Sequence, residues 1–310
     1  MKTQKAQKQT AVVLLNVGGP ASLEDVYPFL ASFFSDPEIL NIPSPFRYVL
    51  AHIFARARLK KAKHIYGLLG GGSPLLPQTL SQAKALQKEL GKGYKVFVAM
   101  RHAAPFIKEV SQKIAKGSFK KTILLPLCPH YSLTTTGSFF QMWGEDSAIR
   151  IPYYPTLPGF LEATTELTLP CYKKASKVGV PRVLFTAHGL PEKNIRRGDP
   201  YQKQIEETAN ALRKKMGFPD ITVCYQSKVG FLRWIGPSLE EEIIRAGEEK
   251  RPLVVVPISF VSEHSETLVE LDIDMKALAL NSGCPQYERV QTVQTHPFFI
   301  KGVASLVRNS

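Results

Sequence analysis

Short apolar runs that end at glycine, proline or histidine constrain the fold of this chain more than any other feature. Each run has the length of one strand, and its continuous apolar character is typical of a strand buried on both faces in a parallel sheet. Stretches with helical periodicity separate the runs, so the order strand, helix, strand, helix, strand occurs twice. The first set comprises residues 11–17, 94–100 and 122–127, and the second comprises residues 183–187, 221–226 and 253–257.

The repeated order predicts an α/β fold with two Rossmann-like halves, each a parallel β-sheet flanked by helices. The first half is expected over residues 1–165 and the second over residues 166–310, with a proline-rich bridge after residue 150. A chain of 310 residues is long enough for two such halves. Because open α/β sheets bind ligands at the carboxyl ends of their strands, we expect the active cleft between the halves.

The formal net charge of +14 at pH 7 indicates an anionic partner. Nucleic acid is the weakest candidate, because the sequence has no RNA-binding signature, zinc finger or arginine-rich tail. The basic N-terminus is not followed by a secretory apolar region, and no run of about 18 apolar residues could span a membrane. Four scattered cysteines without a CxxC pair indicate reduced thiols. We therefore expect a cytoplasmic protein, with peripheral contact at the inner face of the membrane as a further option.

An aromatic and basic segment, residues 29–63, has two interpretations. Its second part places Phe46, Val49 and Ile53 on one face of a helix, with arginines and lysines around it. Base rates for amphipathic helices favour a helical hairpin packed on the body. The alternative is a lip that faces an anionic membrane. The three glycines that follow at residues 70–72 lack the Lys-Ser/Thr ending of a P-loop, so phosphate binding there is a weak alternative.

Three carboxylates follow the last predicted strand at helical spacing. Glu266, Glu270 and Asp274 recur every four residues. On a helix over residues 266–278 they would form one acidic column, and another side of that helix would carry an apolar stripe of Leu268, Leu271, Met275 and Leu278. His264 precedes them, and a histidine, whose ordinary pKa is near ~6.5, can accept a proton at neutral pH or bind a divalent cation beside carboxylates. The alternative is a solvated acidic face.

Seven phrases together resemble the ferrochelatases, which insert ferrous iron into porphyrin. In the family's order they are LLNVGGP (14–20), GGGSP (70–74), YSLTTTGS (131–138), TAHGLPEKNIRRGDPY (186–201), YQSKVG (225–230), WIGP (234–237) and VPISFVSEHSETLVELDID (256–274). The resemblance implies the two-lobed fold, protoporphyrin IX and Fe²⁺ as substrates, and protohaem as the product of the terminal step of haem biosynthesis. It implies no permanently bound cofactor.

The resemblance also implies roles for individual residues. His188 matches the family's catalytic histidine, a proton acceptor and metal-side ligand, and Glu266 matches its acidic partner. This pair is therefore expected to hold the metal, with His264 beside it as a further catalytic group. Glu270 and Asp274 would continue the site as a relay for cations or protons. Contact with the porphyrin is expected from Arg101, Trp234, Tyr131 and Ser132.

The chain departs from the family's pattern in three places. Glu263 stands where an aspartate is usual, so the charge is kept on a longer side chain. Residues 67–69, Gly-Leu-Leu, replace arginines found in animal enzymes just before GGGSP, which puts propionate binding at that point in doubt. Members with a [2Fe–2S] cluster need several cysteines near the C-terminus, and this chain has only Cys284 beyond residue 224. We therefore expect no iron–sulfur cluster.

Three other functions remain open on sequence alone. A cobalt chelatase acting on a corrin precursor would share the two-lobed fold. A haem or porphyrin carrier would bind the same ring without turnover. A phosphate-binding enzyme using the glycine-rich run is the most distant of the three.

Overall fold

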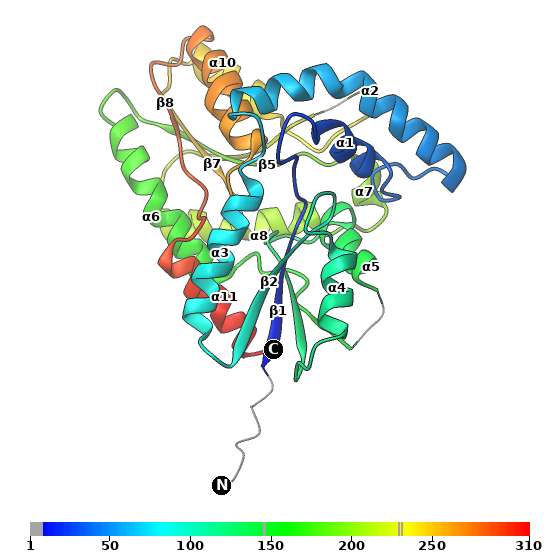
Figure 1. Ribbon diagram of the computed structural model, residues 1–310. Coiled ribbons are helices and arrows are strands. Elements are labelled where there is room, and N and C mark those ends of the chain that lie inside the picture. Colours follow the sequence, from blue (N-terminus) through cyan, green and yellow to red (C-terminus); the bar gives the residue numbers. More distant parts are fainter. Residues whose placement is uncertain (1–8, 145–146, 229, 231) are drawn as a thin grey trace.

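Two four-stranded sheets form the framework of the molecule (Figure 1). The structure, a computed structural model, describes residues 9–144, 147–228, 230 and 232–310; the basic segment 1–8 and Val229 of the YQSKVG phrase lie outside these described residues. The strands are β1 (Thr10–Asn16), β2 (Tyr94–Met100), β3 (Thr122–Pro126), β4 (Ile149–Arg150), β5 (Arg182–His188), β6 (Ile221–Gln226), β7 (Leu253–Pro257) and β8 (Tyr287–Arg289). One sheet has the order β2-β1-β3-β4 and the other β6-β5-β7-β8, with parallel neighbours throughout.

The two sheets confirm the predicted α/β architecture of two equivalent halves. The strand order of the second sheet repeats that of the first, with the earliest strand next to the centre in both. The six predicted runs coincide with β1 to β3 and β5 to β7 to within one residue at each end. The edge strands β4 and β8 were not predicted, because runs of two and three residues carry no periodic signal.

Helices cover both faces of each sheet, which explains why β1 and β7 are buried along their whole length. These helices are α3 (Leu75–Leu90), α4 (Ile107–Ala115), α5 (Ser138–Trp143), α6 (Pro158–Ala175), α8 (Tyr201–Met216), α9 (Leu239–Glu248), α10 (Lys276–Asn281) and α11 (Pro297–Arg308). In the first half, α3, α6 and α11 pack on one face and α4 and α5 on the other. In the second half, α6 and α8 pack on one face and α9 and α10 on the other.

The last helix, α11, returns to the first half. Its Phe299 meets Phe160 of α6 with ring centroids 6.2 Å apart, and its Val303 joins the core beneath the first sheet. The predicted division at residue 165 falls inside α6, which packs against both halves. The two halves are therefore units of the structure, but no single position in the sequence divides one from the other.

Each half contains a π-helix after its third strand. These are η1 (Leu133–Gly137), which leads into α5, and η2 (Glu266–Met275), which leads into α10. The sequence predicts an α-helix over residues 266–278, whereas its first 10 residues adopt the wider π-helical turn, with i→i+5 hydrogen bonds. The predicted apolar side is correct, because Leu271 and Met275 are buried against the second sheet.

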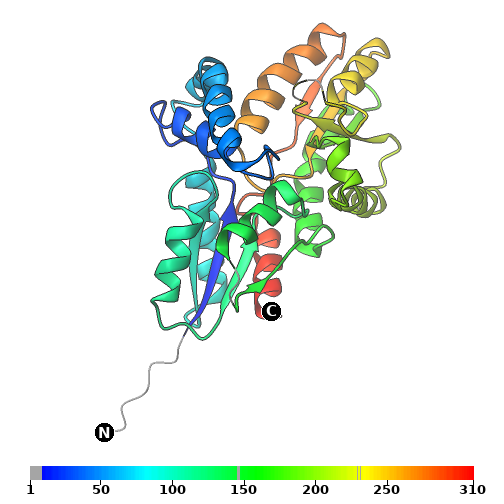
Figure 2. The ribbon, with the colours of Figure 1, turned by 90° about the vertical axis from the view of Figure 1, so that its right-hand side faces the viewer.

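A helical hairpin stands above the first sheet and across from the second half, as Figure 2 shows from the side. It consists of α1 (Val26–Phe34) and α2 (Ser44–Leu68), which pack through a small core of their own. Ala51 and Ala55 of α2 are fully buried there, whereas Phe46, Val49 and Ile53 are 64%, 61% and 51% exposed. The apolar face predicted for this helix therefore points to solvent. No helix in the described part of the chain is both long and apolar enough to cross a membrane.

One buried glutamine connects the halves directly. The amide nitrogen of Gln82, on α3, donates to the carbonyl oxygens of Val261 at 2.9 Å and Gln294 at 3.1 Å. Its amide oxygen accepts from the Ser262 hydroxyl at 3.0 Å. Because Gln82 is only 1% exposed, water does not compete for these bonds.

The start of β1 and the carboxyl end of the chain lie at the same end of the molecule. Both are remote from the α1–α2 hairpin in Figure 1 and in Figure 2. The carboxyl end of β1 points toward the hairpin in both views.

Candidate active site

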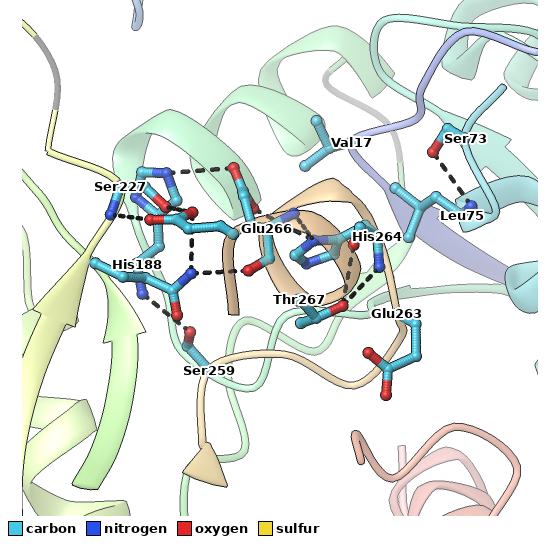
Figure 3. Close-up of polar contacts among 12 residues, drawn as sticks. Val17, Ser73, Leu75, His188, Ser227, Ser259, Glu263, His264, Glu266 and Thr267 are labelled. Atoms are coloured by element: carbon cyan, nitrogen blue, oxygen red, sulfur yellow. Dashed lines mark hydrogen bonds and ion pairs between the residues drawn. The ribbon is translucent and has the colours of Figure 1, made fainter. Parts of the chain in front are cut away.

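The imidazole of His188, the last residue of β5, is the centre of the candidate site (Figure 3). Its Nδ1 lies 2.6 Å from the carbonyl oxygen of Gly189, and its Nε2 lies 3.4 Å from Oε1 of Glu266. A carbonyl oxygen only accepts hydrogen bonds, so Nδ1 carries a proton and donates it. This fixes the ring with Nε2 toward the carboxylate. The His188 side chain is 38% exposed, so the pair is open to a ligand.

Glu266, at the start of η2, lies between two histidines. Its Oε2 is 3.5 Å from Nδ1 of His264, and its backbone nitrogen donates to that same Nδ1 at 3.2 Å. The His264 Nδ1 therefore acts as an acceptor, which is the neutral form of the ring. The ring also packs edge-on against Phe260, with centroids 4.5 Å apart. The structure thus brings together three groups that the sequence proposed as catalytic.

The His188–Glu266 pair is ionic at neutral pH. Burial alone would lower the pKa of His188, but the charge and hydrogen bond of Glu266 outweigh it and raise this pKa to about 9. Burial would likewise raise the pKa of Glu266, but His188 lowers it to about 2. Burial lowers the pKa of His264, so that ring stays neutral. His188 therefore differs from an ordinary histidine: it must lose a proton before it can accept one.

Two residues that the sequence did not single out as site residues hold Glu270 in place. Ser227 donates to this carboxylate through its backbone nitrogen at 2.8 Å and its hydroxyl at 2.6 Å. Gln226 donates from one amide nitrogen to Glu270 at 3.1 Å and to the Glu266 carbonyl at 3.0 Å. Burial, followed by the charge of Glu266, raises the pKa of Glu270. The position of these two residues directly after a strand was the signal that could have identified them.

The three carboxylates predicted to form an acidic column differ in their exposure. Asp274, near the end of η2, is exposed, whereas Glu266 and Glu270 are partly buried. Within the described residues, no three His, Cys, Asp or Glu side chains form a group that could hold a metal ion by themselves. The His188–Glu266 pair can supply one nitrogen and one oxygen ligand.

The carboxylate of Glu263 points away from His188, as Figure 3 shows. Its Oε1 accepts from Nη1 of Arg289 at 2.7 Å and from the backbone nitrogen of Thr292 at 2.9 Å. The longer side chain at this position therefore extends into the protein rather than into the cleft.

Comparison with known proteins identifies the family. The family model described as Ferrochelatase matches residues 9–310. The chain is 45% identical to the Ferrochelatase of Caulobacter vibrioides (strain NA1000 / CB15N), over 98% of this chain and 90% of that protein. It is 44% identical to the Ferrochelatase of Aquifex aeolicus (strain VF5), over 96% of this chain and 98% of that protein. The chain belongs to the ferrochelatase family.

Solved structures share the fold of this ferrochelatase family member. SirB from Bacillus subtilis with Fe³⁺ aligns with a TM-score of 0.54 at 13% identity, over 97% of this chain and 95% of that one. DR2241 from Deinococcus radiodurans, a multi-domain protein with structural similarity to chelatases, aligns with a TM-score of 0.51 at 14% identity, over 96% of this chain and 55% of that one. At such identities the likeness concerns the fold alone.

Family membership confirms the predicted class of activity. The chain is an enzyme that inserts ferrous iron into a porphyrin in haem synthesis, so a porphyrin and Fe²⁺ are its substrates. A carrier without turnover and a phosphate-binding enzyme are therefore not retained as alternatives.

The indole of Trp234 lies against Gly189, the residue after His188. A Cβ atom built on Gly189 would lie 3.0 Å from the Trp234 ring. Any residue other than glycine at this position would therefore displace the indole. Trp234 also lines a cavity of 150 Å³ together with Tyr225 and Gln226. Trp234 thus lies next to the residue that follows His188, and its contact with a porphyrin stays a prediction.

The guanidinium of Arg101 is already paired within the first half. Its Nη2 lies 2.8 Å from Oδ2 of Asp36, and its Nε donates to the Ser138 hydroxyl at 2.7 Å. Burial lowers the pKa of Arg101, and Asp36 acts against that shift. Arg101 also lines a cavity of 440 Å³ with Lys108 and Trp143. The structure does not place it in contact with His188 or Glu266.

Ser132 and Tyr131 join the two halves of the enzyme. The Ser132 hydroxyl donates to Oδ2 of Asp199 at 2.8 Å, and the Tyr131 backbone nitrogen donates to Oε1 of Gln204 at 2.7 Å. Ser132 is 2% exposed, so its hydroxyl serves this contact rather than an open surface. Burial, followed by the charge of Asp199, raises the pKa of the Tyr131 phenol.

Proposed function

We propose that this enzyme inserts Fe²⁺ into protoporphyrin IX to form protohaem, with His188 and Glu266 facing the centre of the ring. The observation that carries the proposal is the 3.4 Å contact between the His188 Nε2 and the Glu266 carboxylate. The pair is accessible, and it lies at the carboxyl ends of the strands where α/β sheets bind ligands. It combines a metal ligand with a proton acceptor, and metal insertion needs both.

The chemistry follows from the charge of this pair. Fe²⁺ is attracted to the anionic Glu266, and its positive charge lowers the pKa of the adjacent His188, which then releases its proton. The neutral Nε2 can accept a proton from a pyrrole nitrogen. Two pyrrole protons leave as the iron binds the four nitrogens, so the charge of the ring is balanced. We propose that the protons leave through Glu270 toward Asp274 at the surface.

The porphyrin ring is proposed to lie against Trp234, beside His188. Ring contact over a rigid wall can bend the macrocycle and turn its nitrogen lone pairs out of the plane. For Arg101, we propose propionate binding by exchange with Asp36, since the guanidinium is already balanced by that carboxylate. Tyr131 and Ser132 would then contribute to substrate binding through the position of the loop that they anchor.

A metallation assay with pure enzyme tests the proposal. Protoporphyrin IX is mixed with Fe²⁺ under anaerobic conditions, or with Zn²⁺, and the Soret band is followed. The native enzyme should convert the free-base spectrum to that of the metalloporphyrin, and His188→Ala should lose at least ~10²-fold in rate, the scale of a general base. His64→Ala, at an exposed position on α2, is the control and should keep the native rate. Near-native turnover by His188→Ala would remove this residue from the mechanism.

We propose that the enzyme has no resident iron–sulfur cluster. An ordinary cluster needs four thiolates together. Cys224 and Cys284 pack in the hydrophobic core of the second half, and Cys128 lies after β3 in the first half. Burial raises the pKa of the Cys128 thiol to about 12, which disfavours the thiolate. The anaerobic preparation should be colourless, and stoichiometric iron and sulfide in it would contradict the proposal.

We also propose that α2 contacts an anionic membrane surface. Phe46, Val49 and Ile53 expose apolar surface on a helix that also carries Arg56 and Arg58. Basic residues near an acidic leaflet contribute about 1 kcal/mol each, and exposed apolar side chains add insertion. A poorly soluble porphyrin substrate would gain access to the enzyme directly from the lipid.

A further inference from the structure

A single arginine on β8 contacts carboxylates on both sides of the catalytic residues. Nε and Nη2 of Arg289 donate to the two oxygens of Asp272 at 2.8 and 2.5 Å, and Nη1 donates to Glu263 at 2.7 Å. The side chains of Arg289 and Glu263 are 8% and 6% exposed. The guanidinium therefore forms a fork in which one side holds Asp272 and the other holds Glu263.

The two carboxylates bracket the catalytic segment in the sequence. Glu263 directly precedes His264, and Asp272 belongs to η2, which begins at Glu266. The backbone on either side of His264 and Glu266 is thus tied to one rigid point on the second sheet. Neither carboxylate touches His188, because Glu263 points away from it (Figure 3) and Asp272 is bound to Arg289.

Rigid fixation at two points matters for this segment in particular. A π-helix is rarely stable by its own backbone geometry, so its shape depends on side-chain contacts outside the helix. Glu266 on η2 must remain 3.4 Å from the Nε2 of His188, which ends β5. A shift of about 1 Å in such a group can cost ~10²-fold in rate.

We infer that Arg289 is the positioning residue that holds Glu266 and His264 in register with His188. The inference rests on the proposed function of those residues. Arg289 acts through Glu263 and Asp272 and touches neither the porphyrin nor the iron. Its planar fork is essential, since a lysine ammonium would keep the charge but could not bind both carboxylates in the same geometry.

A matched pair of variants tests this inference. Arg289→Lys is compared with Arg182→Lys at the start of β5, at the opposite end of the same sheet. Arg182 is also 8% exposed and also binds two carboxylates, Asp220 at 3.2 Å and Glu249 at 2.8 Å. Urea denaturation measures the stability of each variant, porphyrin fluorescence quenching measures ring binding, and the Soret assay with Zn²⁺ gives kcat and the KM for the metal.

The two variants should lose comparable stability but differ in catalysis. Arg289→Lys should lower kcat by ~10- to 10²-fold and raise the KM for Zn²⁺, with porphyrin binding unchanged. Arg182→Lys should keep the native kcat and KM. Asp272→Asn breaks only the more exposed side of the fork and should give a smaller loss of kcat. It is the test variant if Arg289→Lys does not fold. Native kinetics in folded Arg289→Lys or in Asp272→Asn, or an equal loss in Arg182→Lys, would overturn the inference.

The outcome is separable from the proposed function. Failure of the native enzyme to metallate the porphyrin, or full activity of His188→Ala, would overturn the proposed function. The positioning inference fails by itself when His188→Ala is inactive and Arg289→Lys retains native kinetics.

Discussion

At the scale of single residues, one proton defines the resting state of the site. It is held by the His188 ring beside the ionised Glu266 carboxylate, and the Gly189 carbonyl fixes which nitrogen faces the acid. The resting enzyme therefore presents an ion pair rather than a free base. An incoming dication can break that pair, so binding of the metal and release of the first proton are linked events.

The ion pair should make stability depend on pH. The pKa of His188 is raised to about 9 in the folded enzyme. Its contribution to stability is thus fully present below the unfolded pKa of ~6.5 and is lost as the pH rises through 9. The unfolding free energy of the native enzyme should fall between pH 6.5 and 9.5. Glu266→Gln should remove this fall, since it removes the partner that raises the pKa.

Urea denaturation at pH 6.0, 7.5 and 9.5 checks this expectation. The control is Glu192→Gln, which breaks an exposed pair with Arg196 and should leave the pH dependence of the native enzyme intact. The difference in pH dependence between the native enzyme and Glu266→Gln should be small. The side chains of His188 and Glu266 are 38% and 37% exposed, so solvent screens the pair. An equal slope in the native enzyme and Glu266→Gln would contradict the raised pKa.

The two outer carboxylates of the column should differ in their effect on turnover. Glu270 is partly buried, next to Glu266 and bound by Ser227, so Glu270→Gln should lower kcat and weaken the dependence on metal concentration. Asp274 is exposed, and Asp274→Asn should have a smaller effect. Steady-state kinetics against metal concentration measures both. A double variant with unchanged kinetics and a raised melting temperature would end the relay proposal and leave a solvated acidic face.

The sequence predicted which residues gather at the cleft better than how their side chains point. His188 ends a strand and His264 and Glu266 follow another, so the shared carboxyl edge of a parallel sheet explains why they meet. The direction of Glu263 depends on Arg289, a partner 26 residues further along the chain that no local pattern reveals. Arg101 likewise depends on Asp36, which is distant in sequence.

At the scale of elements, the π-helix η2 shows the limit of periodicity. The apolar stripe identified the buried side correctly, because Leu271 and Met275 face the sheet. It did not distinguish an α-helix from a π-helix, because the four-residue spacing of Leu271 and Met275 places both side chains on nearly the same side of either helix. The same element type occurs at the same place in the first half as η1. Each half thus departs from α-helical geometry at the edge that faces the cleft.

The helix α2 should bind anionic vesicles through its exposed face. Replacing Phe46, Val49 and Ile53 by serine should abolish flotation with vesicles that contain phosphatidylserine, because these side chains provide the apolar contact. Binding by the native enzyme should weaken as salt is added. The control replaces Val178 and Val180, which are 53% and 61% exposed on the loop after α6. Equal flotation by the α2 variant and the control would return α2 to a plain helical hairpin.

At the scale of the whole molecule, two sheets with the same strand order form a single body. The three longer strands of each half were predictable because each is an apolar run bounded by turn residues. The return of α11 to the first half was not, since an amphipathic helix does not encode which of two similar sheets it will cover. Contacts such as that of Gln82 with Val261 then hold the halves in one arrangement.

Loss of the Gln82 bridge should destabilise the enzyme more than loss of a similar glutamine on the same helix. Gln82→Ala leaves two buried carbonyls and a hydroxyl without their partner, which should cost about 1–3 kcal/mol of unfolding free energy. Gln87 also makes three bonds, but within the first half and near solvent. Gln87→Ala should cost less than about 1 kcal/mol. Urea denaturation of both variants measures these losses. Equal losses of unfolding free energy would show that the bridge between the halves adds nothing to stability.

The position of the chain ends has a practical consequence. The carboxyl end lies at the pole opposite α2 (Figure 1 and Figure 2). A bead or sensor chip that captures the enzyme by a carboxyl-terminal tag would therefore display α2 outward, toward vesicles passing over the support. Capture through an engineered thiol on α2 would invert the molecule and block that face. The two orientations of one immobilised enzyme would thus serve as each other's control in a binding measurement.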